Sequence, residues 1–379
     1  MRRNHPVARR EFLRVIGGVG GLLALDACVG ASPSTPPNSA PPPAPTPAAT
    51  NAPATAAPAA SKSVTITTSI TPDFVQVPLI LAAQMGAFAR YGLDESNAPM
   101  AAGVMTAALI SKSATYATIS VAGPMLGMVN KGKNIIAFGQ LTHQNSNLLS
   151  VSTQFTNAAN VPANASTTDK LKALKGARWA SISPNSATQV VIEYLMSQVG
   201  YQPNRDYSVT FINSIDGMVS ALNQKQIDAF LANAPGPQTV AANGTGVTYL
   251  DLATAQLPAF DGMSWAVLWA LREDLDANPD LAKATLRAVW AAQKLLQTDP
   301  NKAKDLIRPT FASLPQNVFD QCWTDSLALY PASPRITADS FDKGLKLFNQ
   351  QSEATDQVSK PAQDLFTNEY VDAIAQEFA

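Results

Sequence analysis

The chain has 379 residues, of which 15% are charged and 46% hydrophobic, and its formal net charge is −1. A balance this close to neutral lacks the basic stripe on which nucleic-acid binding depends, so we expect no nucleic-acid partner. The chain is longer than one hydrophobic core usually serves, and we therefore expect two folded lobes.

Residues 1–28 have the order of charge, apolar run and cysteine that is typical of an export signal. Five arginines precede a Gly-rich apolar run at 15–25, which is too short to span a bilayer as a mature helix. The segment 9–14 resembles the twin-arginine export motif, and 25–28 (Leu-Asp-Ala-Cys) resembles a bacterial lipobox. We expect export, by the twin-arginine or the general secretory route, and a lipid anchor on Cys28.

Residues 29–61 consist almost entirely of Ala, Pro, Ser, Thr, Asn and Gly and carry no charge. Such a segment cannot bury enough apolar surface to offset the entropy cost of ordering it. Its prolines keep it extended. We predict a disordered tether that holds a folded part just off a membrane surface.

The first part of the folded region alternates strands with helices, which is the pattern of a mostly parallel sheet. The predicted strands are 64–70, one that begins at 93, 116–120 and 135–138. The predicted helices are 77–89, 104–112 and 124–130.

The second part repeats this pattern after a crossing strand at 148–152 and a polar surface loop at 156–168. Its predicted strands are 178–182, 208–212 and 227–231, with helices at 189–199 and up to 223. The chain then recrosses at 251–264 into a buried strand, 265–270, and apolar stripes at core spacing predict helices at 278–297, 300–308, 315–330, 338–351 and 363–378. We predict an α/β fold in which lobe 1 contains 62–148 and 264–379, lobe 2 contains 149–263, and two crossing strands join them.

The segment 182–188 (Ile-Ser-Pro-Asn-Ser-Ala-Thr) joins a predicted strand to a predicted helix. This arrangement directs unpaired backbone N–H groups and the positive end of a helix dipole toward one point, where an electron-rich ligand group binds well. The alternative is a structural helix start with Asn185 or Ser186 as its N-cap. The residues alone leave both interpretations open.

Several strand ends open onto small polar turns. Because ligands of open α/β sheets bind outside the carboxyl ends of the strands, these turns should line one crevice. The candidate ligand-binding residues are Asp73, Phe74, Ser120, Gly123, Asn145, Asn185, Ser186, Ala187, Thr188, Asn233, Pro235 and Trp265, with Gln76, Gln144 and Asn213 beside them. The set contains no Arg or Lys, so it favours a neutral or singly charged ligand, with Phe74 or Trp265 as a stacking wall.

The order and spacing of several segments resemble the periplasmic substrate-binding proteins of the nitrate, sulfonate, taurine and thiamine-precursor type. The segments are 83–94, 122–124, 171–176, 183–188, Gly200 and 222–235. The resemblance covers about residues 64–379. It implies two α/β lobes that close on a small molecule and deliver it to an ABC permease.

We therefore predict an extracytoplasmic, lipid-anchored solute-binding protein of an ABC importer that captures a small organic molecule or anion by hinge closure between two lobes. We expect it to be monomeric, with no cofactor, no metal and no catalytic residue. The alternatives are an enzyme related to thiamine-pyrimidine synthesis and a ligand-sensing surface lipoprotein. The enzyme alternative is disfavoured because the region after the signal has one histidine, His143, and because no Lys lies at a strand-end turn. Cys322 lies in a predicted helix, where a buried structural thiol is the default.

Overall fold

The computed structural model describes residues 61–254 and 257–379. The described residues belong to one compact unit. The expected export signal, Cys28 and all but the last residue of the expected tether lie outside the described residues.

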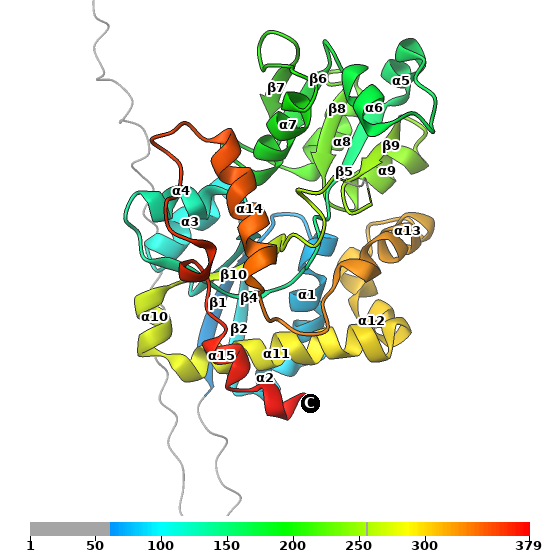
Figure 1. Ribbon diagram of the computed structural model, residues 1–379. Helices are drawn as coiled ribbons and strands as arrows, with labels where there is room; N and C mark the ends of the chain where they lie inside the picture. The colour runs from blue at the N-terminus through cyan, green and yellow to red at the C-terminus, as the bar shows by residue number, and fades with distance from the viewer. Residues whose placement is uncertain (1–60, 255–256) are drawn as a thin grey trace, which may run out of the picture. The chain divides into compact units, whose positions relative to one another are not determined.

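Five strands form the first sheet, in the order β2-β1-β3-β10-β4. Four of them run parallel, and β10 is antiparallel to both of its neighbours. Their bounds are β1 Lys62–Thr68, β2 Leu93–Pro99, β3 Tyr116–Ser120, β4 Ile135–Gln140 and β10 Ala266–Leu271. The strand that returns from the second lobe is therefore the one antiparallel member of this sheet (Figure 1).

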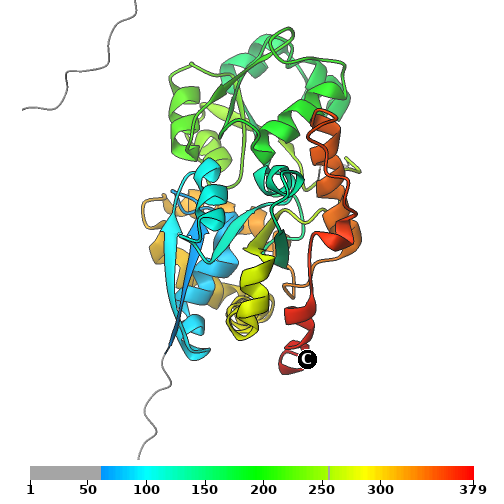
Figure 2. The same ribbon diagram turned by 90° about the vertical axis from the view of Figure 1, so that its left-hand side faces the viewer.

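The second sheet has the same design, in the order β7-β6-β8-β5-β9. Here β5, the first strand after the chain leaves the first sheet, is antiparallel to β8 and β9. The bounds are β5 Leu148–Ser152, β6 Arg178–Ser181, β7 Ser208–Phe211, β8 Ala229–Ala232 and β9 Gly246–Asp251. The predicted α/β fold, with two mostly parallel sheets and two crossings, is confirmed (Figure 2).

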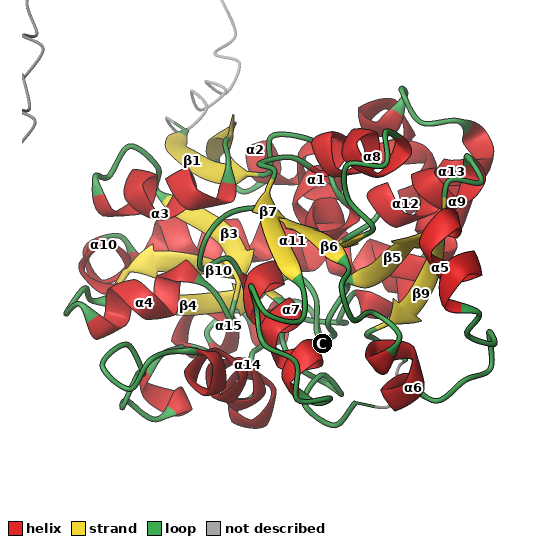
Figure 3. Cartoon of the chain, turned by 90° about the horizontal axis from the view of Figure 1, so that it is seen from above, coloured by secondary structure: helices red, strands yellow, loops and turns green. Residues whose placement is uncertain are grey.

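Helices cover both sheets, as Figure 3 shows. With the first sheet lie α1 Val77–Gln84, α2 Ala87–Arg90, α3 Ala102–Ile110, α4 Pro124–Asn130, α10 Arg272–Ala277, α11 Pro279–Thr298, α12 Pro300–Ile307, α13 Gln316–Ser326, α14 Ala338–Gln351 and α15 Glu369–Asp372. With the second sheet lie α5 Thr153–Ala159, α6 Thr167–Lys172, α7 Ala187–Ser197, α8 Ile215–Asn223 and α9 Gly236–Ala242. In addition, α14 packs against α7 and α13 packs against α9, so helices of the C-terminal part contact the second lobe.

Several strands of both sheets are buried on both faces, which explains their largely apolar sequences. Every residue of β4, β10, β5 and β8 is buried. Trp269 on β10 and Trp179 on β6 are among the largest fully buried side chains. Each sheet thus forms a packed core whose strand ends are fixed in position, and these ends support the turns described below.

Three predicted elements differ from the structure, each for a local reason. The helix predicted at 77–89 breaks into α1 and α2 at Gly86, whose φ of +66° glycine adopts easily. The loop predicted from 156 begins inside α5, which the Ser152 side chain caps by accepting from the N–H of Phe155. The continuous helix predicted at 363–378 is wrong for its first part, because Leu365 and Thr367 hydrogen-bond with Ala137 and extend the edge of the first sheet beyond β4. Only α15 and a short 3-10 helix at Ala375–Glu377 are helical in the rest of the range.

Elements α6, α9, α10 and β9 are not among the predicted ones, and they lie next to turns or in short polar stretches. Most are only six or seven residues long, and α9 begins directly after Pro235. Periodicity over so few residues does not separate a strand or a single helical turn from a loop.

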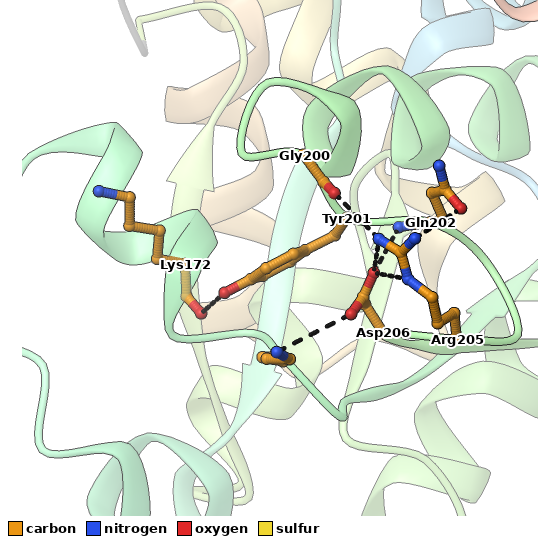
Figure 4. A network of polar contacts seen from close by, with 7 residues as sticks. Lys172, Gly200, Tyr201, Gln202, Arg205 and Asp206 are labelled. Carbon is orange, nitrogen blue, oxygen red and sulfur yellow. Dashed lines mark hydrogen bonds and ion pairs between the residues drawn. The ribbon is translucent and has the colours of Figure 1, made fainter.

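The connection from α7 to β7 is held by a polar network at the outer edge of the second sheet (Figure 4). The Arg205 guanidinium donates to Asp206 and to the carbonyl of Gly200, and Tyr201 Oη donates to the carbonyl of Lys172 at 3.0 Å. Arg205 also keeps the pKa of Asp206 below its usual value. Because these groups are largely exposed, we expect the network to fix the turn while adding little to the free energy of folding.

Candidate functional site

A cavity of about 120 Å³ lies between the two sheets, which is many times the space that one water needs. The strand ends of both lobes contribute to it, as expected for ligand sites of open α/β sheets. Its lining includes the ends of β1, β3, β6, β7 and β8 and the starts of α4, α7 and α8. The lining residues are Ser69, Ile70, Thr71, Asp73, Val75, Gln76, Met100, Ala101, Met105, Thr118, Ile119, Ser120, Pro124, Ile182, Ser186, Ala187, Thr188, Asn213, Ser214, Ile215, Leu231, Ala232, Asn233, Trp265 and Ala266.

Two chain segments connect the lobes behind this cavity. One joins β4 to β5 and the other joins β9 to β10. Gln144 in the first segment donates to the carbonyl of Ala253 and accepts from the N–H of Gly262, both in the second segment. The two connections are thus tied to each other, which is the construction expected of a common hinge.

The lobes contact each other directly on the cavity side. The N–H of Phe74 donates to the carbonyl of Ala234 at 3.1 Å, and Thr71 Oγ1 donates to Asp216 Oδ2 at 3.4 Å. A Cβ placed on Gly123 would lie 3.7 Å from the Cβ of Ala187, so the starts of α4 and α7 approach closely. These contacts describe a closed arrangement of the two lobes.

The wall at the start of α7 is built from three hydroxyl groups, those of Ser181, Ser186 and Thr188, here called the hydroxyl triad. Their oxygens lie 2.9–3.1 Å from one another. Ser186 is the N-cap of α7: its side chain accepts from the N–H of Gln189 and donates to the carbonyl of Ser183. Helix geometry leaves the N–H groups of Ala187 and Thr188 without a partner inside the helix. This wall therefore presents hydrogen-bond donors to the cavity.

A different polar chain, here called the Asp73 chain, lies in the first lobe. Ser69 Oγ donates to Asp73 Oδ2 at 2.9 Å, and Gln76 Nε2 donates to Ser69 Oγ and to Thr118 Oγ1. Thr118 Oγ1 in turn donates to the carbonyl of Thr67 at 2.7 Å. Asp73 is only 4% exposed, and its Oδ1 has no hydrogen-bond partner. Burial raises the pKa of Asp73 to about 6, and the hydrogen bond from Ser69 limits the rise.

Seven of the twelve residues expected from the sequence to bind ligand line the cavity. They are Asp73, Ser120, Ser186, Ala187, Thr188, Asn233 and Trp265. Gln76 and Asn213, expected beside them, line it as well. The polar turns at the strand ends are therefore brought together.

The other five lie near the cavity without lining it. Phe74 packs against Phe311 and Phe319 in the core of the first lobe, and its exposed fraction is 1%. Gly123 is the N-cap of α4, and Pro235 directly precedes α9. Asn145 is buried in the first crossing and accepts hydrogen bonds from Asn147. Asn185 is exposed, and its backbone N–H donates to Gln189.

Some lining residues were not among the expected ones. Ser69 and Thr118 connect Asp73 and Gln76 into one chain, and their positions near the ends of β1 and β3 were the available signal. Met100, Met105, Ile182, Ile215 and Leu231 supply the apolar part of the wall. Sequence patterns assign such residues to the core, and only the structure shows that they face the cavity.

The histidine and the cysteine of the described residues lie outside the cavity lining. His143 lies in the first crossing and Cys322 is buried on α13, and neither lines the cavity. Burial raises the pKa of the Cys322 thiol, which disfavours the reactive thiolate. Within 61–254 and 257–379 there is no cluster of three His, Cys, Asp or Glu side chains that could hold a metal ion. In the same ranges, no helix is both long and apolar enough for a membrane crossing.

A protein-family model described as the NMT1-like family matches residues 58–308. This range contains the whole of the second sheet and all of the cavity lining. A search of curated protein sequences gave no match.

Solved structures with the same fold cover most of the chain. A protein from Bordetella bronchiseptica RB50 is 23% identical, with a TM-score of 0.70, over 83% of this chain and 98% of that chain. The periplasmic nitrate-binding protein NrtA from Synechocystis PCC 6803 is 17% identical, with a TM-score of 0.63, over 84% and 89%. The alkanesulfonate-binding protein SsuA from Xanthomonas axonopodis pv. citri, bound to MOPS, is 15% identical, with a TM-score of 0.62, over 82% and 99%. At these identities the likeness establishes the fold, which agrees with the resemblance stated from the sequence.

Proposed function

The chain belongs to the NMT1-like family, and from this premise we propose that it is the extracytoplasmic solute-binding protein of an ABC importer. In this role it captures a small organic molecule between its two lobes by hinge closure and passes it to a membrane permease. The observation that carries the proposal is the cavity between the two sheets, which receives residues from strand ends of both lobes. A cavity shared by two lobes closes around a ligand when the lobes approach and opens when they separate.

The composition of the cavity lining also supports binding. The wall is mainly apolar, with a few polar groups at defined places, and this is the usual character of a small-molecule site. The crossing segments tied by Gln144 supply a hinge, and the contacts of Phe74 with Ala234 and of Thr71 with Asp216 supply a closed state. Binding chemistry requires no group beyond these.

The N-terminal part of the proposal rests on sequence. The basic segment, the apolar run and the Leu-Asp-Ala-Cys segment support export and lipidation of Cys28, and 29–61 supports a tether. A tether of this composition leaves the folded lobes free to open, close and reach a permease beside the anchor. The anchored protein is expected to act as a monomer.

Native mass spectrometry of the protein isolated from its host tests the proposal. We expect one small molecule per chain, released on denaturation. Refolded, ligand-free protein should rebind the released molecule in calorimetry with a stoichiometry of about one.

Two further measurements on the released molecule, its chemical conversion by the protein and its uptake by the host, separate the alternatives. Chemical conversion of the rebound molecule would favour the thiamine-pyrimidine enzyme. Binding without any effect of the protein on uptake by the host would favour a sensory lipoprotein. A protein that is isolated empty and binds no small molecule from host extract would contradict the proposed function.

A further inference from the structure

The cavity contains one ionisable side chain, and that side chain is acidic. Of the described residues that line it, Asp73 is the sole Asp, Glu, Lys, Arg or His. A site for a sulfonate or nitrate ion gains affinity from a guanidinium or ammonium group. This cavity offers such an anion no positively charged side chain, and instead places a carboxylate in its wall.

Every polar side-chain hydrogen of the Asp73 chain already takes part in a hydrogen bond within the protein, so none is left to donate to a ligand. A carbonyl oxygen only accepts, so the Thr118 hydroxyl must donate to Thr67. Both Nε2 hydrogens of Gln76 then go to the hydroxyls of Ser69 and Thr118, while its Oε1 accepts from the N–H of Ser69. The Ser69 hydroxyl donates to Asp73.

What remains free on this wall is acceptor capacity. The Oδ1 atom of Asp73 lacks a hydrogen-bond partner within the described residues and has less than 1 Å² of accessible surface, so a ligand reaches it when the side chain turns toward the cavity that Asp73 lines. A buried carboxylate oxygen without a hydrogen bond is costly, and a donor or a positive charge removes that cost.

The start of α7 has the opposite character. The Thr188 hydroxyl can turn toward a ligand because the Ser181 hydroxyl can supply the bond to Ser186 in its place. Ser120 Oγ lies close by, since a Cβ on Gly123 would be 3.7 Å both from it and from the Cβ of Ala187. With the backbone N–H groups of the first turn of α7, these hydroxyls suit a hydrogen-bond acceptor.

The space between these two polar walls is apolar. Methionine and branched aliphatic side chains line it, namely Met100, Met105, Ile182, Ile215 and Leu231. A ligand with an apolar middle part would bury the most apolar surface against this wall and therefore bind most tightly.

On the basis of the proposed solute-binding function, we propose that the ligand is a small amine with an apolar body. Its protonated nitrogen donates to Asp73, and an acceptor group at its other end faces the start of α7. Such a ligand carries a positive charge, which an inorganic anion or a simple sulfonate does not.

Matched triplets of small molecules test this class. Each triplet shares one apolar body and one acceptor group and carries an ammonium, a hydroxyl or a carboxylate at the same position; 4-(aminomethyl)benzoate, 4-(hydroxymethyl)benzoate and terephthalate form one such triplet. Thermal shift at pH 7.5 finds the triplets that bind, and calorimetry then measures each member. The ammonium member should bind at least about tenfold more tightly than its hydroxyl partner.

Two variants make the test specific to Asp73. Asp73→Asn should weaken the ammonium member at least about tenfold and leave the hydroxyl member within about threefold. Asp305→Asn is the matched control, because Asp305 on α12 is exposed and lies outside the cavity lining, and it should change neither affinity.

Each other outcome overturns a specific step. Tightest binding of the carboxylate members, or an unchanged ammonium affinity in Asp73→Asn, would overturn the proposed ligand class. Equal weakening by Asp305→Asn would assign the preference for the ammonium member to the general charge of the protein and overturn the role of Asp73. Absence of a thermal shift from every triplet and from host extract would overturn the proposed function on which the inference rests.

Discussion

The substitution Asp73→Asn should change how the stability of the ligand-free protein depends on pH. The pKa of Asp73 is about 6 in the folded protein and 3.8 in the unfolded chain, because burial penalises the charged carboxylate. Between these values the folded state holds a proton that the unfolded state has released. The stability associated with this proton is fully present below the unfolded pKa and is lost as pH rises through the folded pKa.

The magnitude follows from the difference between the two pKa values. Each pKa unit corresponds to ~1.36 kcal/mol, so ionised Asp73 costs on the order of 3 kcal/mol of folding free energy at pH 8. Between pH 5 and pH 8 the loss is about 1.4 kcal/mol, since the unfolded chain is already mostly ionised at pH 5. Asparagine does not titrate, so Asp73→Asn should gain about 1.4 kcal/mol relative to wild type between pH 5 and pH 8.

Urea unfolding of ligand-free protein at pH 5, 6, 7 and 8 measures this difference. Any pH-independent effect of the substitution cancels, because the comparison is between the pH dependences of variant and wild type. Asp305→Asn serves as the control and should follow the wild-type curve, since its side chain is exposed. Parallel curves for wild type and Asp73→Asn would show that burial does not raise the pKa of this carboxylate.

Three further expectations concern binding, closure and anchoring. Thr188→Ala should weaken binding of the co-purified molecule about threefold to tenfold in calorimetry, and Thr188→Ser should not, because it keeps the hydroxyl; equal affinities for both variants would make the turn a structural cap only. Saturation with that molecule should lower the radius of gyration in small-angle scattering, because the contact between Thr71 and Asp216 belongs to a closed state; an unchanged profile would count against a hinge. Cys28→Ala should move the protein from the membrane fraction to the soluble fraction in its host, and continued membrane association would rule out a lipid anchor at that residue.

The fold could be predicted from sequence largely because its strands carry strong local signals. The continuous apolar runs of β4 and β10 mark strands that are buried on both faces, and long amphipathic helices such as α11 and α14 were predicted close to their observed bounds. The prediction for residues 363–378 failed because their apolar spacing fits a helix, whereas pairing of Phe366 with Ala137 at the edge of the first sheet decides the conformation there. That pairing joins residues more than 200 positions apart, and local periodicity holds no information about it.

The candidate site could be predicted in outline for a topological reason. Polar turns after parallel strands gather at one edge of each sheet, so Asp73, Ser120, Thr188 and Asn233 converge on one cavity. Sequence could not show which turn residues face inward. Asn185 and Ser186 are adjacent and similar in type, yet one is exposed with a positive φ and the other caps α7 from inside the wall.

Whether the cavity prefers a positively or a negatively charged ligand could not be predicted from the sequence. The absence of Arg and Lys from the strand-end turns was visible and favoured a neutral or singly charged ligand. The preference for a positively charged ligand depends on the hydrogen-bond directions among Ser69, Gln76 and Thr118. These directions leave Asp73 with an unpaired oxygen. Such directions follow from atomic positions alone.

A crystal structure of the protein with the molecule that co-purifies from its host tests the central claim most directly. The account predicts that the molecule lies between the two sheets, with one end against Asp73 and the other within hydrogen-bond distance of Thr188. A molecule bound outside this cavity, for example in the depression lined by Leu252, Leu257 and Asp261, would contradict it.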